Sequence, residues 1–384
     1  MALIECPECG RQISDEAHFC PSCGRPNEPE SGGRYFVIEE EVLTKYSGPG
    51  GHVVVPEGVK SIGSRAFKDC LELAGITIPR SVESIGSEAF GNCQSLVSVS
   101  ILHPHYMGEY ETFPGLGTIG AGAFNSCTSL LSFTVPREVT TIEESTFSGC
   151  ANLARVTIPD GVTAIESRAF QNCGLTRIDI PSSVSRIGDS AFWGCNLVDI
   201  NIPSTTISLG ESCFAACDDL KSVTIPEGVA SIENGTFAYC DNLTSVLLAG
   251  SVKGIGYAAF ADCPSLKEVV IQRGLQGIGE RAFENCTGLS KINFPDSVNW
   301  VARFAFGNCT ALSKSKVNEI VRRFGPYALD DFAEFEASDF YDHDEGDEYD
   351  HYIEQQEYYA VDVWEEFTPR HIVERAENEG DFPY

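Results

Sequence analysis

Long apolar stretches are missing from this 384-residue chain. No run approaches the roughly 18 to 20 apolar residues that a membrane-spanning helix needs. The segment from Met1 to Gly10 also lacks the basic region and apolar core of a secretory signal. We therefore expect a cytoplasmic protein without a transmembrane segment. Export by a route that leaves no such signal, which would place the protein at the cell surface, is the alternative.

Motifs of common catalytic sites are also missing. The sequence has no glycine-rich phosphate loop, no Gly-x-Ser-x-Gly turn and no pair of carboxylates tied to the end of a strand or helix. No small-molecule substrate is evident either. We therefore expect that the protein is not an enzyme.

Basic residues are scarce, and the acidic excess is uneven. The chain has 26 Lys and Arg against 56 Asp and Glu, a formal charge of −30. Residues 330–384 contain 20 of these acids and only Arg370 and Arg375. This segment is too charged to pack, so we predict a partly disordered acidic tail. Its aromatic residues, such as Tyr349 and Trp364, leave a recognition motif and a solvated extension both open.

One short phrase, Ala-Phe-x-x-Cys with minor variations, occurs eleven times. From Cys70 to Cys309 its cysteines advance by 22 or 23 residues, except for a step of 34 between Cys93 and Cys127. A fixed period of this length predicts a repeat solenoid, because one unit cannot bury its own apolar face and must stack on its neighbours. The phenylalanines are Phe67, Phe90, Phe124, Phe147, Phe170, Phe192, Phe214, Phe237, Phe260, Phe283 and Phe306.

Each unit predicts a short strand and a return. Val156 and Ile158 alternate with Thr157, and Pro159 then ends the strand. Stacked copies should form one parallel sheet with strands about 4.8 Å apart. Apolar residues re-enter the interior through irregular or short helical stretches. We expect the phenylalanines and the repeat cysteines to be core residues, with redox or metal chemistry of the thiols as the alternative.

This pattern resembles the BspA-type leucine-rich repeat, also called the Treponema pallidum type, over about residues 52–312. The resemblance implies a curved solenoid that binds proteins, and several relatives are described as surface adhesins. We assign residues 31–51 to an N-terminal cap and 52–314 to an eleven-unit solenoid. Residues 315–329, with apolar side chains spaced as in an amphipathic helix, form a C-terminal capping helix.

Two matched cysteine pairs lie near the N-terminus, Cys6 with Cys9 and Cys20 with Cys23. Four thiolates at this spacing predict one tetrahedral Zn²⁺ site, which is structural because no coordination position stays open for water. A redox Cys-x-x-Cys pair is the alternative. The segment resembles the short bacterial zinc-ribbon family, and we assign residues 1–30 to a zinc ribbon and linker. Its acidic surroundings disfavour nucleic acid as a partner.

Outward-facing strand positions give the candidate partner-binding residues. Arg155, Arg177, Asp179 and Asn201 form a polar middle, and Leu247 with Val270 forms an apolar spot. The alternative is that these residues form an ordinary solvated sheet face with no binding role. The 34-residue step adds a loop with further candidates, for which a tolerated surface loop and a His-x-His metal site are the alternatives. These are His105, Tyr106 and Tyr110.

We therefore expect a non-catalytic protein–protein interaction scaffold that uses the outward strand face, with a protein partner of unknown identity. The alternative is a cell-surface adhesin that binds host or neighbouring-cell proteins. A third class, an enzyme or nucleic-acid regulator that uses the zinc ribbon, would need its own evidence.

Overall fold

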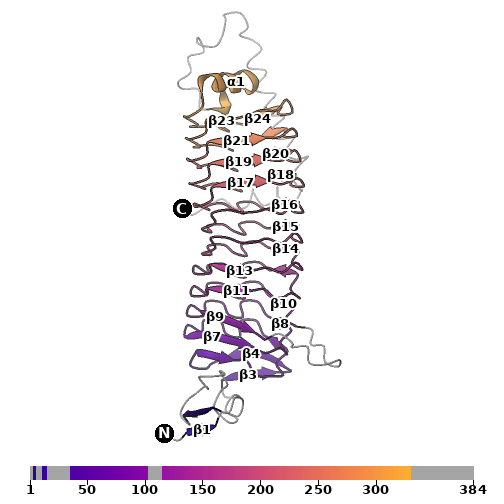
Figure 1. The fold of residues 1–384 in the computed structure, drawn as a ribbon, viewed down its shortest axis with the longest axis vertical. Helices are drawn as coiled ribbons and strands as arrows, with labels where there is room; N and C mark the ends of the chain where they lie inside the picture. The colour runs from indigo at the N-terminus through magenta and orange to yellow at the C-terminus, as the bar shows by residue number, and fades with distance from the viewer. Residues whose placement is uncertain (1–2, 6–10, 15–34, 103–114, 330–384) are drawn as a thin grey trace, which may run out of the picture. The chain divides into compact units, whose positions relative to one another are not determined.

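Residues 35–102 and 115–329 form a stack of similar turns, which confirms the predicted repeat solenoid (Figure 1). The computed structural model describes these residues together with 3–5 and 11–14. Within them, the α-helix is α1 (Lys314–Phe324), followed by a short 3₁₀ helix, η2 (Pro326–Ala328). No helix in this part of the chain is long and apolar enough to cross a membrane.

The first ladder of strands arises from the alternation of apolar and polar residues. Val156 is buried between the exposed Arg155 and Thr157, as the sequence predicts. The strands pair in parallel within three groups, β5-β7-β9, β11-β13 and β17-β19-β21-β23. Their bounds are β5 (Gly51–Val54), β7 (Leu73–Ile78), β9 (Ser98–Ile101), β11 (Ser132–Thr134), β13 (Arg155–Thr157), β17 (Ser222–Ile225), β19 (Ser245–Leu248), β21 (Glu268–Ile271) and β23 (Lys291–Ile292).

A second ladder corrects the expectation of a single parallel sheet. Ile165 and its counterparts do not lie in irregular returns but end two-residue parallel strands, with Ile165 opposite Ile142 and Ile187. Two residues are too few for an alternation pattern, so the sequence did not reveal them. These strands are β6 (Ser61–Ile62), β8 (Ser84–Ile85), β10 (Thr118–Ile119), β12 (Thr141–Ile142), β14 (Ala164–Ile165), β15 (Arg186–Ile187), β16 (Ser208–Leu209), β18 (Ser231–Ile232), β20 (Gly254–Ile255), β22 (Gly277–Ile278) and β24 (Trp300–Val301).

The remaining side of each turn carries the Ala-Phe-x-x-Cys phrase in an irregular conformation. The backbone N–H groups of Arg168, Phe170 and Asn172 each donate to a carbonyl of the next repeat at 2.8 Å. Arg168 and Asn172 have φ of 57° and 55°, in the left-handed region that asparagine and glycine tolerate best. This requirement explains the frequent Asn, Asp or Gly directly before the repeat cysteine.

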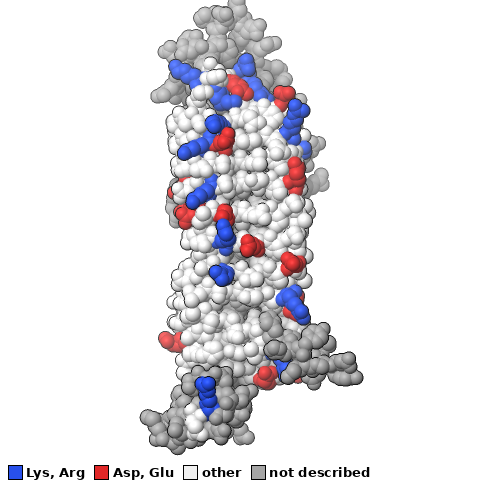
Figure 2. All heavy atoms as spheres, viewed as in Figure 1, with Lys and Arg blue, Asp and Glu red and all other residues white. Residues whose placement is uncertain are grey.

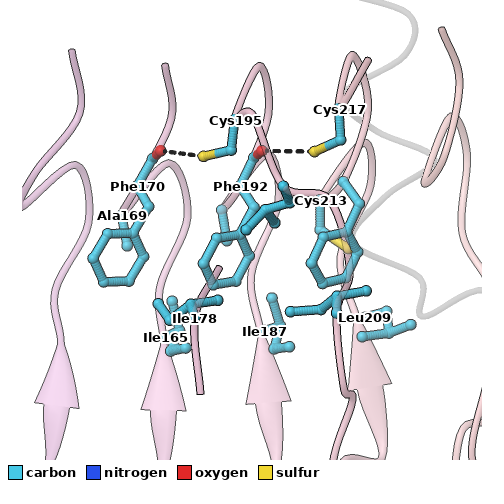
Figure 3. Packing of buried hydrophobic residues seen from close by; sticks show 14 of the residues in the cluster. Ile165, Ala169, Phe170, Ile178, Ile187, Phe192, Cys195, Leu209, Cys213 and Cys217 are labelled. Carbon is cyan, nitrogen blue, oxygen red and sulfur yellow. Dashed lines mark hydrogen bonds between the residues drawn. The ribbon is translucent and has the colours of Figure 1, made fainter. Parts of the chain in front are cut away.

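The core is a column of phenylalanine rings flanked by aliphatic and thiol side chains (Figure 3). All eleven repeat phenylalanines are buried, which confirms their predicted place. Successive rings stack nearly parallel, with the centroids of Phe170 and Phe192 5.3 Å apart. The described cysteines are free thiols, and all except the half-buried Cys70 are buried. Their predicted place in the core is therefore confirmed for every repeat cysteine after the first.

Aromatic and helical residues close the two ends of the stack. At the start, β3 (Phe36–Glu39) pairs antiparallel with β4 (Val42–Tyr46), and β4 pairs with β6. The ring of Tyr46 stacks on Phe67 with centroids 4.9 Å apart. At the other end, Ile320 and Phe324 of α1 are buried. The Arg323 guanidinium donates to the carbonyls of Phe294, Pro295 and Val298 in the last repeat.

Candidate interaction surface

The predicted zinc ligands Cys6, Cys9, Cys20 and Cys23 lie outside the described residues. The structure nevertheless describes a hairpin around the first pair, β1 (Leu3–Glu5) and β2 (Gln12–Ser14), in which Glu5 pairs with Gln12. Cys6 and Cys9 belong to the short connection between these two paired residues. Two cysteines separated by two residues supply two of the four thiolates that a tetrahedral zinc site needs. The described residues by themselves contain no group of three or more His, Cys, Asp or Glu placed to hold a metal.

The predicted polar middle lies on one solvent-facing side, the outward side of the first ladder, which we call the strand face. Arg155, Arg177, Asp179 and Asn201 are all exposed. Arg177 donates to Asp199 of the next repeat with Nη2 to Oδ2 2.7 Å. Because both side chains are exposed, this pair adds little stability and stays available to a partner.

The polar middle coincides with an interruption of the first ladder. No strand is formed between β13 and β17 in this ladder, although the Phe170, Phe192 and Phe214 rings continue to stack. The two repeats concerned are the 22-residue ones, in which a single residue separates Cys173 from Leu175 instead of two. The shortened link explains why these strands lose the register of their neighbours.

The predicted apolar spot is present and its two residues are neighbours. Leu247 of β19 lies opposite Val270 of β21 in the ladder register. Val270 is 41% exposed and Leu247 is half-buried. The inserted-loop candidates His105, Tyr106 and Tyr110, like the acidic tail of residues 330–384, lie outside the described residues.

Two further features of the strand face escaped the sequence analysis. Val97 and Leu131 directly precede β9 and β11 and are 41% and 53% exposed. The Leu131 N–H donates to the Val97 carbonyl. Lys221 and Lys267 occupy the equivalent place in later repeats and are also exposed. All four directly follow the repeat leucine, and the strand period would place this position on the buried side with Val223, so alternation alone could not have revealed its exposure.

Charge divides the strand face along the stack (Figure 2). Strands β7, β9 and β11 contain no charged residue, whereas β13, β21 and β23 each carry one and Lys221 directly precedes β17. The strand face therefore offers an uncharged half and a charged half to a partner.

Comparison with known families agrees with this architecture. The family described as "BspA type Leucine rich repeat region (6 copies)" matches residues 49–173, 117–244 and 253–343, and a zinc-ribbon domain matches residues 6–27. Since the first match covers well over half of the chain, the protein belongs to the BspA-type leucine-rich repeat family. No curated protein matches the chain.

Two solved structures are similar to this chain. A leucine-rich repeat protein from Bacteroides ovatus is 28% identical with a TM-score of 0.50, covering 76% of this chain and 94% of its own. A leucine rich cell surface protein from Faecalibacterium prausnitzii is 29% identical with a TM-score of 0.42, covering 74% and 94%. The first of these likenesses supports the same repeat fold.

Proposed function

We propose that this protein is a non-catalytic scaffold that binds a partner protein through its strand face. The observation that carries this proposal is the exposure of Arg155, Arg177, Asp179 and Asn201 on the strand face of successive repeats, with Val270 exposed on the same face further along the stack. Fixed backbone positions hold these side chains in place before binding, so little conformational entropy is lost on association. Solenoids of stacked repeats offer such extended surfaces in general.

In this proposal the zinc ribbon is a structural element. Cys6, Cys9, Cys20 and Cys23 hold one Zn²⁺, and the ion's binding energy folds the N-terminal segment. The match to a zinc-ribbon domain and the β1–β2 hairpin around the first cysteine pair support this part.

The test is affinity capture from the native host with the full chain as bait. The variant Leu247→Asp with Val270→Asp should lose the captured partner, because it places charge on the apolar spot. Ile207→Asp is the control, since Ile207 is 64% exposed and directly precedes β16 of the second ladder. Equal capture by both variants would remove the strand face from the proposal.

A surface adhesin is the second candidate, because several members of the BspA-type family are described as adhesins. Treatment of intact cells with an external protease separates the two. An adhesin is digested while cytoplasmic marker proteins stay intact, whereas a cytoplasmic scaffold survives until the cells are lysed. The strand-face variants apply in both cases.

A further inference from the structure

Three lysines on the charged half of the strand face lack an acidic partner among the described residues. Lys221, Lys267 and Lys291 are exposed, and none of them forms an ion pair within this part of the chain. Lys221 and Lys267 share one column, since Thr244 N–H donates to the Lys221 carbonyl at 2.8 Å and Lys267 N–H to the Thr244 carbonyl at 2.9 Å. Lys291 lies one strand further, opposite Glu268.

These unpaired lysines lie in a molecule whose net charge is negative. Residues 35–102 and 115–329 together contain 28 Asp and Glu against 21 Lys and Arg. From β13 to β23 the strand face reverses this balance. It carries the cations Arg155, Arg177, Lys221, Lys267 and Lys291 against the anions Asp179, Asp199 and Glu268. At physiological ionic strength, charges more than about 8 Å away are screened, so distant acids contribute little. The exposed Asp218, Asp219 and Asp241, in the turns that precede the lysine column, offset part of its positive charge.

We propose that the strand face from β17 to β23 binds an extended, acidic segment of the partner protein. This inference rests on the proposed function and names the chemistry of the partner. Carboxylates of the segment pair with Lys221, Lys267 and Lys291.

Hydroxyl groups beside the lysines favour an extended segment over a helical one. Ser222 and Ser245 lie opposite each other in the ladder on the same face, next to the lysine column. An extended chain exposes its backbone N–H and C=O groups, which these hydroxyls can bind, whereas a helix bonds its own. The apolar pair Leu247 and Val270 borders this strip and receives an uncharged side chain of the segment.

The spacing of the lysines predicts the spacing of the acids. Lys221 and Lys267 are two ladder steps apart, about 9.6 Å at the usual strand separation. Three residues of an extended chain span about 10 Å. A segment that runs along the stack therefore presents an acidic residue to successive lysines of this column when every third residue is Asp or Glu.

The experiment uses the full chain and a fluorescent 16-residue synthetic peptide with Glu at every third position and Ser or Val between, followed by anisotropy. The triple variant Lys221→Gln, Lys267→Gln, Lys291→Gln should bind about tenfold more weakly, the size expected for three exposed charge pairs. The control triple variant Lys253→Gln, Arg273→Gln, Arg168→Gln removes the same charge from exposed positions elsewhere and should change binding less than about twofold. Higher salt should weaken wild-type binding toward the level of the first variant.

Several outcomes would overturn the inference. If both triple variants bind the peptide equally well, or if the wild type does not bind it at millimolar concentration, the three lysines are not the binding residues. A second peptide has the same composition but carries its Glu residues in one block. If it binds equally well, the proposed spacing of one acid at every third residue is wrong. Tighter binding of a DNA duplex would make the ligand a nucleic acid. Partner capture that depends on Leu247 and Val270 but not on the lysines would leave the proposed function standing while this inference falls.

Discussion

The thiol of Cys195 donates a hydrogen bond to the backbone carbonyl of Phe170 in the preceding repeat, with Sγ 3.1 Å from the oxygen (Figure 3). The same bond recurs from Cys93 to Cys309, each thiol donating to the carbonyl of the phenylalanine in the preceding repeat. The repeat cysteine is therefore both a small apolar core residue and a link between neighbouring turns. This second role explains why alanine would be an incomplete substitute.

Replacement of one such thiol should weaken the stack modestly. Cys195→Ala removes a buried hydrogen bond and leaves a small void, so we expect a loss of about 1 to 2 kcal/mol in the free energy of unfolding. Urea denaturation followed by circular dichroism measures it. Cys70→Ala is the control, because Cys70 is half-buried and its thiol has no such bond. An equal loss in both variants would argue against the inter-repeat bond.

Stability should fall at alkaline pH because of the thiols. Burial raises the pKa of Cys150 and of Cys195 to about 12, from an ordinary value near 9. Since the unfolded thiol loses its proton at lower pH than the folded one, the thiols' contribution is complete below about pH 9 and is lost as pH rises toward 12. Melting temperatures between pH 7 and 11 test this. The double variant Cys150→Ala, Cys195→Ala should show a shallower alkaline decline than the wild type.

Loss of one ring from the phenylalanine column should be severe. Phe170 is fully buried between Phe147 and Phe192, with ring centroids 5.5 and 5.3 Å away. We expect Phe170→Ala to cost about 3 to 5 kcal/mol, through lost burial and a cavity. Thermal melting and amide exchange in the repeats of Phe170 and Phe192 measure it. Phe304→Ala, at a half-exposed position, should cost far less, and an unchanged melting curve for Phe170→Ala would contradict the placement.

Trp300 and Gly277 should be energetically coupled. The Trp300 indole lies where a side chain at Gly277 would project, so a Cβ there would overlap the ring. Gly277→Ala should therefore destabilise by about 1 to 3 kcal/mol and displace the indole, visible as a change in tryptophan fluorescence. In a Trp300→Ala background the overlap is gone, and the same change should be neutral or stabilise by up to about 1 kcal/mol. Additive effects in this cycle would mean that the two residues do not touch.

Removal of zinc should affect the N-terminal segment alone. We expect one zinc per chain by elemental analysis, and its loss in the variant Cys20→Ser, Cys23→Ser. Because the solenoid core is built from its own repeats, its melting temperature should stay unchanged on addition of a chelator. A chelator that melts the solenoid would show that the ribbon supports the repeats.

The sequence was most informative where a pattern repeats. Eleven copies of one phrase are enough to place Phe170 and Cys195 inside and Arg155 outside, because each unit must bury the same face. It was least informative where the pattern is short or broken. The two-residue strands of the second ladder have no alternation, and the shortened link at Cys173 changes the register without changing the residue types.

The sequence alone could not show which lysines lack an acidic partner, and this required the structure. Lys221 and Lys267 are 46 positions apart in the chain, and no local rule pairs or separates them from acids. Only the stacking of repeats shows that they share a column and that no carboxylate among the described residues pairs with them.

The amino-acid sequence determined the repeats, the types of residue that are buried and the solenoid fold. Each repeat has the same apolar face, and stacking the repeats on one another buries it. The second ladder, the thiol-to-carbonyl links and the split of the strand face into uncharged and charged halves were decided by tertiary structure. These features depend on contacts between residues in different repeats, which the order of residues within one repeat does not determine.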